Sequence, residues 1–359
     1  MGQLKFAVLG AGAGGQTMAA VLKSKGHIVK LYDHDTAKIA RLNELGKIVV
    51  TGKFECEGSP DLVTTDITNA VTDVDVIMVC TTTDAHKEIA ELCAPYLRDG
   101  QIFMLNPGHV GGALQVSHII REEHRCTAKI IIAEAGDLMY ACRTSEVGQT
   151  FQSGIKTFTE VATMPAGDVD ELIRILKPIF TNLKPAKNVL ETGFEGGGAM
   201  LHPIPSLMNL NRTDVGQPYD YYLEGITPSV AKLVSACDEE RLAVCHALGM
   251  EVDPLVKSLQ KMYQLTQDDM YELLQHNKAY VGCKSPMSLD HRFIVEDTVS
   301  GLVPLASIGN MLGIKTPIMN AYIEIASVVC GRDFRTEGRT AEELGLAGKT
   351  VKEIYEMIS

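Results

Sequence analysis

The chain has 359 residues, of which 45% are hydrophobic and 22% charged, with 32 glycines and 14 prolines. These values are typical of a folded protein of two domains and exclude collagen, coiled coil and long disordered chains. Thirty-three basic residues against 45 acidic ones give a net charge of -12, which repels phosphate backbones and anionic lipids, so we expect no nucleic-acid partner and no membrane partner.

The first half of the chain alternates short apolar strands with helices. Apolar runs of strand length lie at residues 5–9, 28–32, 74–80, 101–105 and 129–133. Apolar residues at helical spacing lie between them, at residues 16–25, 36–45 and 85–97. Continuous apolar strands separated by helices predict a doubly wound, mainly parallel α/β sheet covered on both faces.

The pattern of polar and apolar residues changes in the second half of the chain. Between about residues 138 and 164 polar and apolar residues alternate, which predicts strands that close one edge of the sheet. From about residue 193 strand signals nearly disappear, and residues 229–248 and 255–275 predict long helices. We therefore expect an α/β domain over residues 1–187 and an all-α domain over residues 188–359.

A glycine-rich turn follows the first predicted strand. Gly10, Gly12 and Gly15 match the pattern G-x-G-x-x-G between that strand and the first helix. In a Rossmann domain, these glycines permit a tight turn, a close approach of the backbone to a pyrophosphate, and close packing of helix on strand. The phosphates then accept hydrogen bonds from the N-terminus of the helix. The turn therefore predicts a dinucleotide site, although glycines also occur in turns that bind nothing.

Three further residues are candidate contacts of that dinucleotide. Asp33 ends the second strand, where a carboxylate accepts hydrogen bonds from ribose hydroxyls and repels a 2′-phosphate. We therefore expect NAD, and we keep NADP open because His34, Lys38 and Arg41 would soften that repulsion. Thr81 and Asn106 follow later strands, and they are as well explained as turn formers.

A histidine is the candidate proton carrier of the second domain. His202 lies in the segment EGGGAMLHPIPSLMN at the start of that domain and titrates near neutral pH. Pro203 and Pro205 restrict the backbone around it, as expected for a positioned side chain, although an isolated histidine is often structural. Asn209, seven residues further on, falls on the same face of a helix that begins near Pro203. It is a candidate contact for a substrate or simply a packed polar residue.

Several longer motifs together resemble those of the opine dehydrogenases. They are GAGAGG at 10–15, NPG..GGAL at 106–114, ACR at 141–143, HP.P.L.N at 202–209, YYLEGITPSV at 221–230, R....D at 292–297, GLVPL at 301–305 and FR.EGRT at 334–340. The likeness spans nearly the whole chain. Members of this family join an α-keto acid, commonly pyruvate, to the amino group of an amino acid and reduce the imine with NADH or NADPH.

The resemblance implies roles for individual residues. His202 and Asp297 match the family's His and Asp pair, and Arg292 matches an arginine that binds a substrate carboxylate. Two carboxylate-bearing substrates need at least one guanidinium, which makes Arg143 a further candidate. The resemblance also implies a dimer formed through the helical domain.

Each of these residues also has a simpler interpretation. In a helix, Arg292 would form an ion pair with Glu296 four residues later. Asp297 would equally serve as the N-cap of a helix through residues 299–305. Arg143 would pair with a nearby glutamate, either Glu134 or Glu146.

Two other classes of protein remain as alternatives. One is a reductase of the same two-domain plan, such as a ketopantoate reductase or a glycerol-3-phosphate dehydrogenase. Those enzymes use a lysine near the start of the helical domain, and residues 193–211 contain none. The other alternative is a non-catalytic NAD-binding protein, which would have no need for a convergent His, Asp and Arg.

The cysteines and the N-terminus bear on the cellular location. The nine cysteines form no C-x-x-C pair and accompany no histidine cluster, so we expect reduced thiols and no metal site. The first residues lack a signal-peptide pattern, and no apolar stretch approaches the roughly 18 residues that span a bilayer. We therefore expect a cytoplasmic protein.

Overall fold

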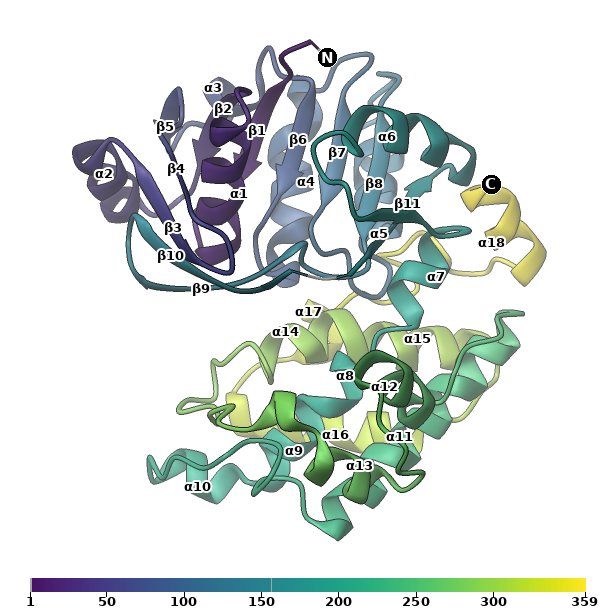
Figure 1. Cartoon of the computed structure of the whole chain (residues 1–359). Coiled ribbons are helices and arrows are strands. Elements are labelled where there is room, and N and C mark those ends of the chain that lie inside the picture. The colour runs from purple at the N-terminus through teal and green to yellow at the C-terminus, as the bar shows by residue number, and fades with distance from the viewer. Residues whose placement is uncertain (1, 156) are drawn as a thin grey trace. The chain divides into compact units, whose positions relative to one another are not determined.

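The computed structural model describes residues 2–155 and 157–359. It forms two compact units, Met1–Gly193 with Tyr355–Ser359, and Phe194–Ile354. The first unit is built on a sheet, and the second is helical (Figure 1). In the part of the chain that the structure describes, no helix is long and apolar enough to cross a membrane.

The main sheet of the first unit has the order β12-β11-β8-β7-β6-β1-β2-β5 (Figure 1). Its strands from β5 to β8 are parallel, whereas β11 is antiparallel to β8. The strands are β1 (Lys5–Leu9), β2 (Ile28–Tyr32), β5 (Leu62–Thr64), β6 (Val76–Val79), β7 (Ile102–Leu105), β8 (Ile131–Ala135), β11 (Thr159–Met164) and β12 (Leu183–Pro185). The predicted mainly parallel sheet is confirmed.

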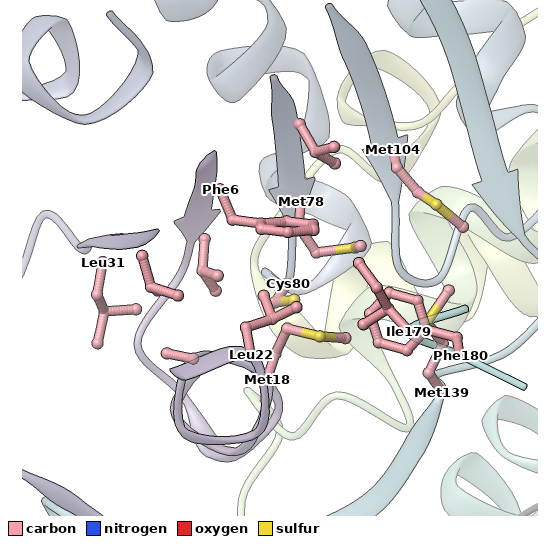
Figure 2. Packing of buried hydrophobic residues seen from close by; sticks show 14 of the residues in the cluster. Phe6, Met18, Leu22, Leu31, Met78, Cys80, Met104, Met139, Ile179 and Phe180 are labelled. Carbon is pink, nitrogen blue, oxygen red and sulfur yellow. The ribbon is translucent and has the colours of Figure 1, made fainter. Parts of the chain in front are cut away.

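Helices connect the strands of this sheet. They are α1 (Ala13–Ser24), α2 (Thr36–Leu45), α3 (Ile67–Val71), α4 (His86–Cys93), α5 (Gly112–His118) and α6 (Val169–Leu176). Apolar side chains from the sheet and from α1 pack with residues from much later in the chain, including Met139, Ile179 and Phe180 (Figure 2). This core fixes the strand ends from which the glycine-rich turn and the loop after β6 emerge.

The prediction that residues 138–164 all close one edge of the main sheet is wrong. Only β11 joins that sheet. The preceding strands, β9 (Tyr140–Glu146) and β10 (Gln149–Ile155), pair with β3 (Ile48–Gly52) and β4 (Cys56–Gly58) in a second sheet of order β4-β3-β10-β9. Local alternation predicts a strand but not its partner, and here α1 provides the surface that this second sheet covers: Thr17 Oγ1 lies 2.9 Å from Thr150 Oγ1.

The second unit confirms the predicted helical fold. Its helices are α8 (Gly198–Leu201), α9 (Pro203–Met208), α10 (Leu210–Asp214), α11 (Pro228–Ala247), α12 (Leu255–Tyr263), α13 (Met270–His276), α14 (Val295–Asp297), α15 (Val303–Met311), α16 (Pro317–Cys330) and α17 (Phe334–Glu337). A π-helical turn, Thr298–Leu302, joins α14 to α15. The single helix predicted over 255–275 is two helices, because Gln264 adopts a left-handed conformation, with φ 56°, that ends α12.

Candidate functional site

Close packing explains two glycines of the glycine-rich turn. Gly10 has φ +96°, and a Cβ on it would lie 2.9 Å from Thr81 Cγ2. A Cβ on Gly15 would lie 1.7 Å from the carbonyl oxygen of Gly10, so any side chain there would push α1 away from β1. A Cβ on Gly12 would meet nothing within 4 Å, which leaves the backbone at the start of α1 approachable.

The N-terminus of α1 is suited to bind an anion. Its N-cap residue, Gly12, offers no side-chain oxygen to the first N–H groups, and its first turn contains no acidic residue. Nearby, Thr81 Oγ1 is buried without a hydrogen-bond partner among the described residues. An uncapped helix N-terminus and an unpaired buried hydroxyl are what a bound dinucleotide would satisfy. The residues present therefore fit the group.

Asp33 has a structural role that sequence analysis missed. Its Oδ2 accepts hydrogen bonds from the Ala11 N–H at 2.7 Å and from Lys38 Nζ at 3.0 Å, and its Oδ1 accepts one from the Asp35 N–H at 2.9 Å. Burial by itself raises the pKa of Asp33, but these hydrogen bonds outweigh it and hold the pKa below its ordinary value. The carboxylate is thus ionised, fixes the glycine-rich turn, and has one acceptor position left on Oδ1 for a ribose hydroxyl.

The buried side chain of Asn106 stabilises the loop that follows β7. It is 1% exposed, its Oδ1 accepts a hydrogen bond from the Met139 N–H at 3.0 Å, and its Nδ2 lies 3.6 Å from Cys80 Sγ. A contact of this side chain with a cofactor stays a prediction. Arg143 lies exposed on β9 of the first unit, in register with Phe151 of β10.

In the second unit, the structure brings His202 and Asp297 together. His202 stands between α8 and α9, and its Nδ1 lies 2.9 Å from Asp297 Oδ2. Pro203 begins α9 directly after it, at a helix position where the missing N–H costs nothing. The Asp297 side chain is 1% exposed and that of His202 is 18% exposed. Asp297 immediately precedes the π-helical turn Thr298–Leu302, but its side chain makes no capping hydrogen bond to that turn. Its carboxylate instead faces the imidazole of His202.

Glycines allow this approach of α8 to the π-helical turn after α14. A Cβ on Gly198 would lie 3.0 Å from Asp297 Oδ1, and a Cβ on Gly301 would lie 2.7 Å from the Cβ of Ala199. A larger residue at Gly301 would separate the two backbones that carry His202 and Asp297. The glycine run that precedes His202 is thus part of how the pair is built.

Aromatic residues fix the imidazole ring. Phe293 stacks on it with ring centroids 4.1 Å apart and an interplanar angle of 12°. Tyr222 Oη lies 3.1 Å from His202 Nε2, and Tyr221 Oη donates to the backbone oxygen of His202. Sequence analysis assigned no role to Tyr222 or Phe293. The tyrosines belong to the quoted YYLEGITPSV motif, but nothing in its spacing related them to a histidine about twenty residues earlier.

Arg292 and Asn209 are held by their own neighbours. Arg292 Nε lies 3.2 Å from Glu296 Oε2, which is the simple ion pair that the sequence allowed, and its side chain remains 54% exposed. Asn209 Nδ2 donates to the backbone oxygens of Pro205 and Gly225 at 2.9 and 2.8 Å. This amide therefore ties the end of α9 to the loop before α11, and a substrate contact for Asn209 stays a prediction.

The arrangement around His202 can move protons. An ionised carboxylate only accepts hydrogen bonds, so Asp297 fixes the proton of neutral His202 on Nδ1 and leaves Nε2 basic. An ionised carboxylate in this position would also stabilise an imidazolium if Nε2 took up a proton. Within the residues that the structure describes, no group of three His, Cys, Asp or Glu side chains could hold a metal ion.

Two family models match different parts of the chain. Residues 185–330 match the α-helical domain of NAD/NADP octopine/nopaline dehydrogenase. Residues 5–132 match the N-terminus of NAD-dependent glycerol-3-phosphate dehydrogenase. The N-terminal part is thus similar to that of a glycerol-3-phosphate dehydrogenase, whereas the helical part is similar to that of the octopine/nopaline dehydrogenases.

Individual proteins are similar over nearly the whole length. An opine dehydrogenase of Arthrobacter sp. (strain 1C) is 36% identical over 346 residues, which cover 96% of each chain. A solved octopine dehydrogenase with NADH and L-arginine has a TM-score of 0.82 at 20% identity and covers 98% of each chain. The same enzyme with NADH and pyruvate has a TM-score of 0.75 at 20% identity and covers 97% of this chain and 99% of that one.

Proposed function

This chain belongs to the opine dehydrogenase family, NAD(P)-dependent oxidoreductases that act on CH–NH bonds, and from that premise we propose that His202, oriented by Asp297, performs its proton transfers. The substrates of the proposed reaction are an α-keto acid, pyruvate in the first instance, and an L-amino acid. The observation that carries the assignment is the 2.9 Å contact between His202 Nδ1 and the buried Asp297 carboxylate. The family assignment does not favour a ketopantoate reductase, a glycerol-3-phosphate dehydrogenase or a non-catalytic binder.

In the proposed reaction, His202 serves two proton transfers. Its neutral Nε2 removes a proton from the ammonium group of the amino acid, so that the free amine attacks the keto carbon. The resulting imidazolium then gives a proton to the hydroxyl of the carbinolamine, which leaves as water. Because the reaction is reversible, the same imidazole returns these protons in the opposite direction. The bound NADH or NADPH supplies the hydride that reduces the imine to a secondary amine.

The cofactor is held by the first unit in this proposal. Gly10, Gly12 and Gly15 bring the backbone to the pyrophosphate, Asp33 accepts from the adenosine ribose, and Thr81 Oγ1 gains a partner. Asn106 supports the neighbouring loop. These assignments rest on the uncapped N-terminus of α1 and on the unpaired buried hydroxyl.

The proposal is tested by following NADH oxidation with pyruvate and a panel of L-amino acids. We expect oxidation that needs both substrates and yields a secondary amine dicarboxylate, identified by mass spectrometry. Oxaloacetate and 2-oxoglutarate serve as alternative keto acids. Oxidation by a keto acid alone, with a hydroxy acid as the product, would contradict the proposal.

Arg292 is proposed to bind a substrate carboxylate. Its guanidinium is half exposed, and its ion pair with Glu296 engages Nε, so a carboxylate can bind at the terminal nitrogens. We expect Arg292→Ala to raise the KM of one substrate by about 10- to 100-fold, since a hydrogen bond to a charged group contributes about 1.5–3 kcal/mol. Steady-state kinetics with each substrate varied in turn would measure this. An unchanged KM for both substrates would leave Arg292 with only its ion pair, and Arg143 would be tested next.

Lys38 is proposed to decide how well NADPH is accepted. Lys38 pairs with Asp33, the carboxylate proposed to bind the adenosine ribose. The 2′-phosphate of NADPH would therefore lie beside the Lys38 ammonium group. We expect Lys38→Met to raise the KM of NADPH relative to that of NADH by about 10-fold, because the variant removes a partner of the phosphate and exposes the charge of Asp33. Arg41→Met is the matched control, since Arg41 pairs with Glu44 at 3.0 Å. Equal KM ratios in the two variants would contradict this role.

We also propose that the protein is a homodimer and that it is cytoplasmic. Ile325 and Val328, about one turn apart on α16, are 49% and 82% exposed, and in this proposal they lie in the homodimer interface. The nine cysteines are all free, which fits a reducing, cytoplasmic compartment.

A further inference from the structure

Tyr222 occupies the one ring nitrogen of His202 that the proposed reaction uses. Nδ1 faces Asp297 at 2.9 Å, and Nε2 faces Tyr222 Oη at 3.1 Å. Burial raises the pKa of Tyr222 above its ordinary value, so at neutral pH the phenol keeps its proton. A neutral phenol donates to the basic Nε2, which gives the hydrogen-bond order Tyr222 to His202 to Asp297.

The phenol is fixed where it stands. The ring of Tyr222 stacks on Tyr280, with centroids 3.9 Å apart and an interplanar angle of 14°. Tyr221 packs edge-on against it at 5.0 Å, and Tyr222 as a whole is 7% exposed. For Tyr222 to leave Nε2, its ring would have to break this stack and expose buried aromatic surface.

His202 is equally unable to turn toward another partner. Phe293 covers one face of the imidazole at 4.1 Å, and Asp297 holds the ring at Nδ1. A rotation that freed Nε2 from Tyr222 would also break the contact with a carboxylate that is 1% exposed. Both ends of the hydrogen bond between Tyr222 and His202 are therefore held by packed neighbours, of which Tyr280 and Asp297 are buried.

We propose that Tyr222 is a proton relay, through which every proton exchanged between His202 and the reactants passes. This inference rests on the proposed function and adds a catalytic residue to it, because it replaces the direct proton transfer between Nε2 and the reactants by transfer through the Tyr222 phenol. As the phenol proton moves to Nε2, the phenol oxygen takes a proton from the substrate ammonium, which leaves a free amine, a neutral phenol and an imidazolium. In the later step the imidazolium returns its proton to the phenol oxygen while the phenol proton goes to the departing hydroxyl of the carbinolamine.

The variant Tyr222→Phe removes the phenol oxygen and keeps the stacked ring. We expect kcat to fall by about 100-fold, at the lower end of what proton transfer contributes, with both KM values within about 3-fold. We also expect the solvent deuterium effect on kcat to change form. We expect a plot of kcat against the deuterium fraction of the solvent to be curved in the parent, where two protons move together. In Tyr222→Phe, the same plot should be linear.

Tyr280→Phe is the matched control. It removes a phenol from the same stacked pair without touching His202, so we expect the parent's curved plot to persist. A Tyr222→Phe variant that keeps the parent's kcat and curvature would overturn the relay and leave Tyr222 as packing. The relay would also be overturned if Tyr280→Phe changed the plot in the same way as Tyr222→Phe.

A measurement without turnover separates this inference from the proposed function. The ¹⁵N shifts of the His202 ring report which nitrogen carries the proton and whether the other accepts a hydrogen bond. We expect an accepting Nε2 in the parent and a change at Nε2 alone in Tyr222→Phe. If the parent oxidised NADH with no amino acid, the proposed function would fail whatever these shifts were. If Nε2 did not change in Tyr222→Phe, the relay would fail even in an active enzyme.

Discussion

His202→Ala is expected to lower kcat by about 10²- to 10⁴-fold, the range that a positioned acid–base group contributes. The Kd of NADH, measured by fluorescence titration, should stay within about 2-fold, because Gly10, Gly12 and Asp33 belong to the other compact unit. The variant thus separates chemistry from cofactor binding. An equal loss of NADH affinity would show that position 202 has been assigned the wrong role.

Two comparisons make this result specific to proton transfer. His276→Ala is the matched control, since His276 is exposed and its Nδ1 contacts the backbone oxygen of Glu272 in its own helix. We expect that variant to keep the parent's kcat. Added imidazole should restore part of the turnover of His202→Ala, because a small base can enter the space that the side chain leaves. A loss that imidazole cannot restore, accompanied by a lower unfolding temperature, would mean that His202 mainly supports the packing of Phe293.

The sequence predicted the parts of this fold that follow from local pattern. The run KFAVL and its glycine-rich turn predict β1 and the start of a dinucleotide site, because strand propensity and the need for glycine are properties of a few adjacent residues. The partner of β10 depends instead on contacts between distant segments. Its pairing with β3 joins residues about one hundred positions apart, and no alternation of polar and apolar residues encodes that choice.

The same distinction applies to the candidate site. The segment around His202 made it a candidate, but its pairing with Asp297 came from a resemblance to known motifs, and their contact joins residues that are 95 positions apart. Tyr222 and Phe293 were missed because an aromatic residue in a helical domain is usually core. Their role depends on the side that each presents to the imidazole, which only the tertiary structure determines. Asp33 was predicted for the ribose, whereas its bond to the Ala11 N–H became visible only in the folded turn.

Arg241 shows how misleading a local pattern can be. In sequence it stands three residues after Asp238 on a long helix, which is the spacing of an ordinary surface ion pair. In the structure it is 1% exposed, and its Nη2 lies 2.7 Å from Asp238 Oδ1. Its other hydrogen bonds reach the backbone oxygens of Phe194 and Asp253, while Asp238 Oδ2 accepts from the Leu255 N–H. The pair therefore joins the beginning of the second unit to α11 and to the start of α12.

Arg241→Met is expected to lower the free energy of unfolding by about 3–5 kcal/mol, measured by urea denaturation, because it leaves the Asp238 carboxylate buried without its counter-ion. Arg174→Met is the matched control, since Arg174 pairs with Glu171 at the same spacing but its side chain is 70% exposed. That change should cost less than about 1 kcal/mol.

The double variant Asp238→Asn with Arg241→Met separates the unpaired charge from lost packing. It removes the buried charge and keeps an acceptor for the Leu255 N–H, so its loss should be smaller than the sum of the two single losses by about 1–3 kcal/mol. Strict additivity would mean that the charges are solvated in the folded protein. Because Arg241 and Asp238 contact neither His202 nor Asp297 directly, folded Arg241→Met at low temperature should retain turnover, which would distinguish loss of stability from loss of catalysis.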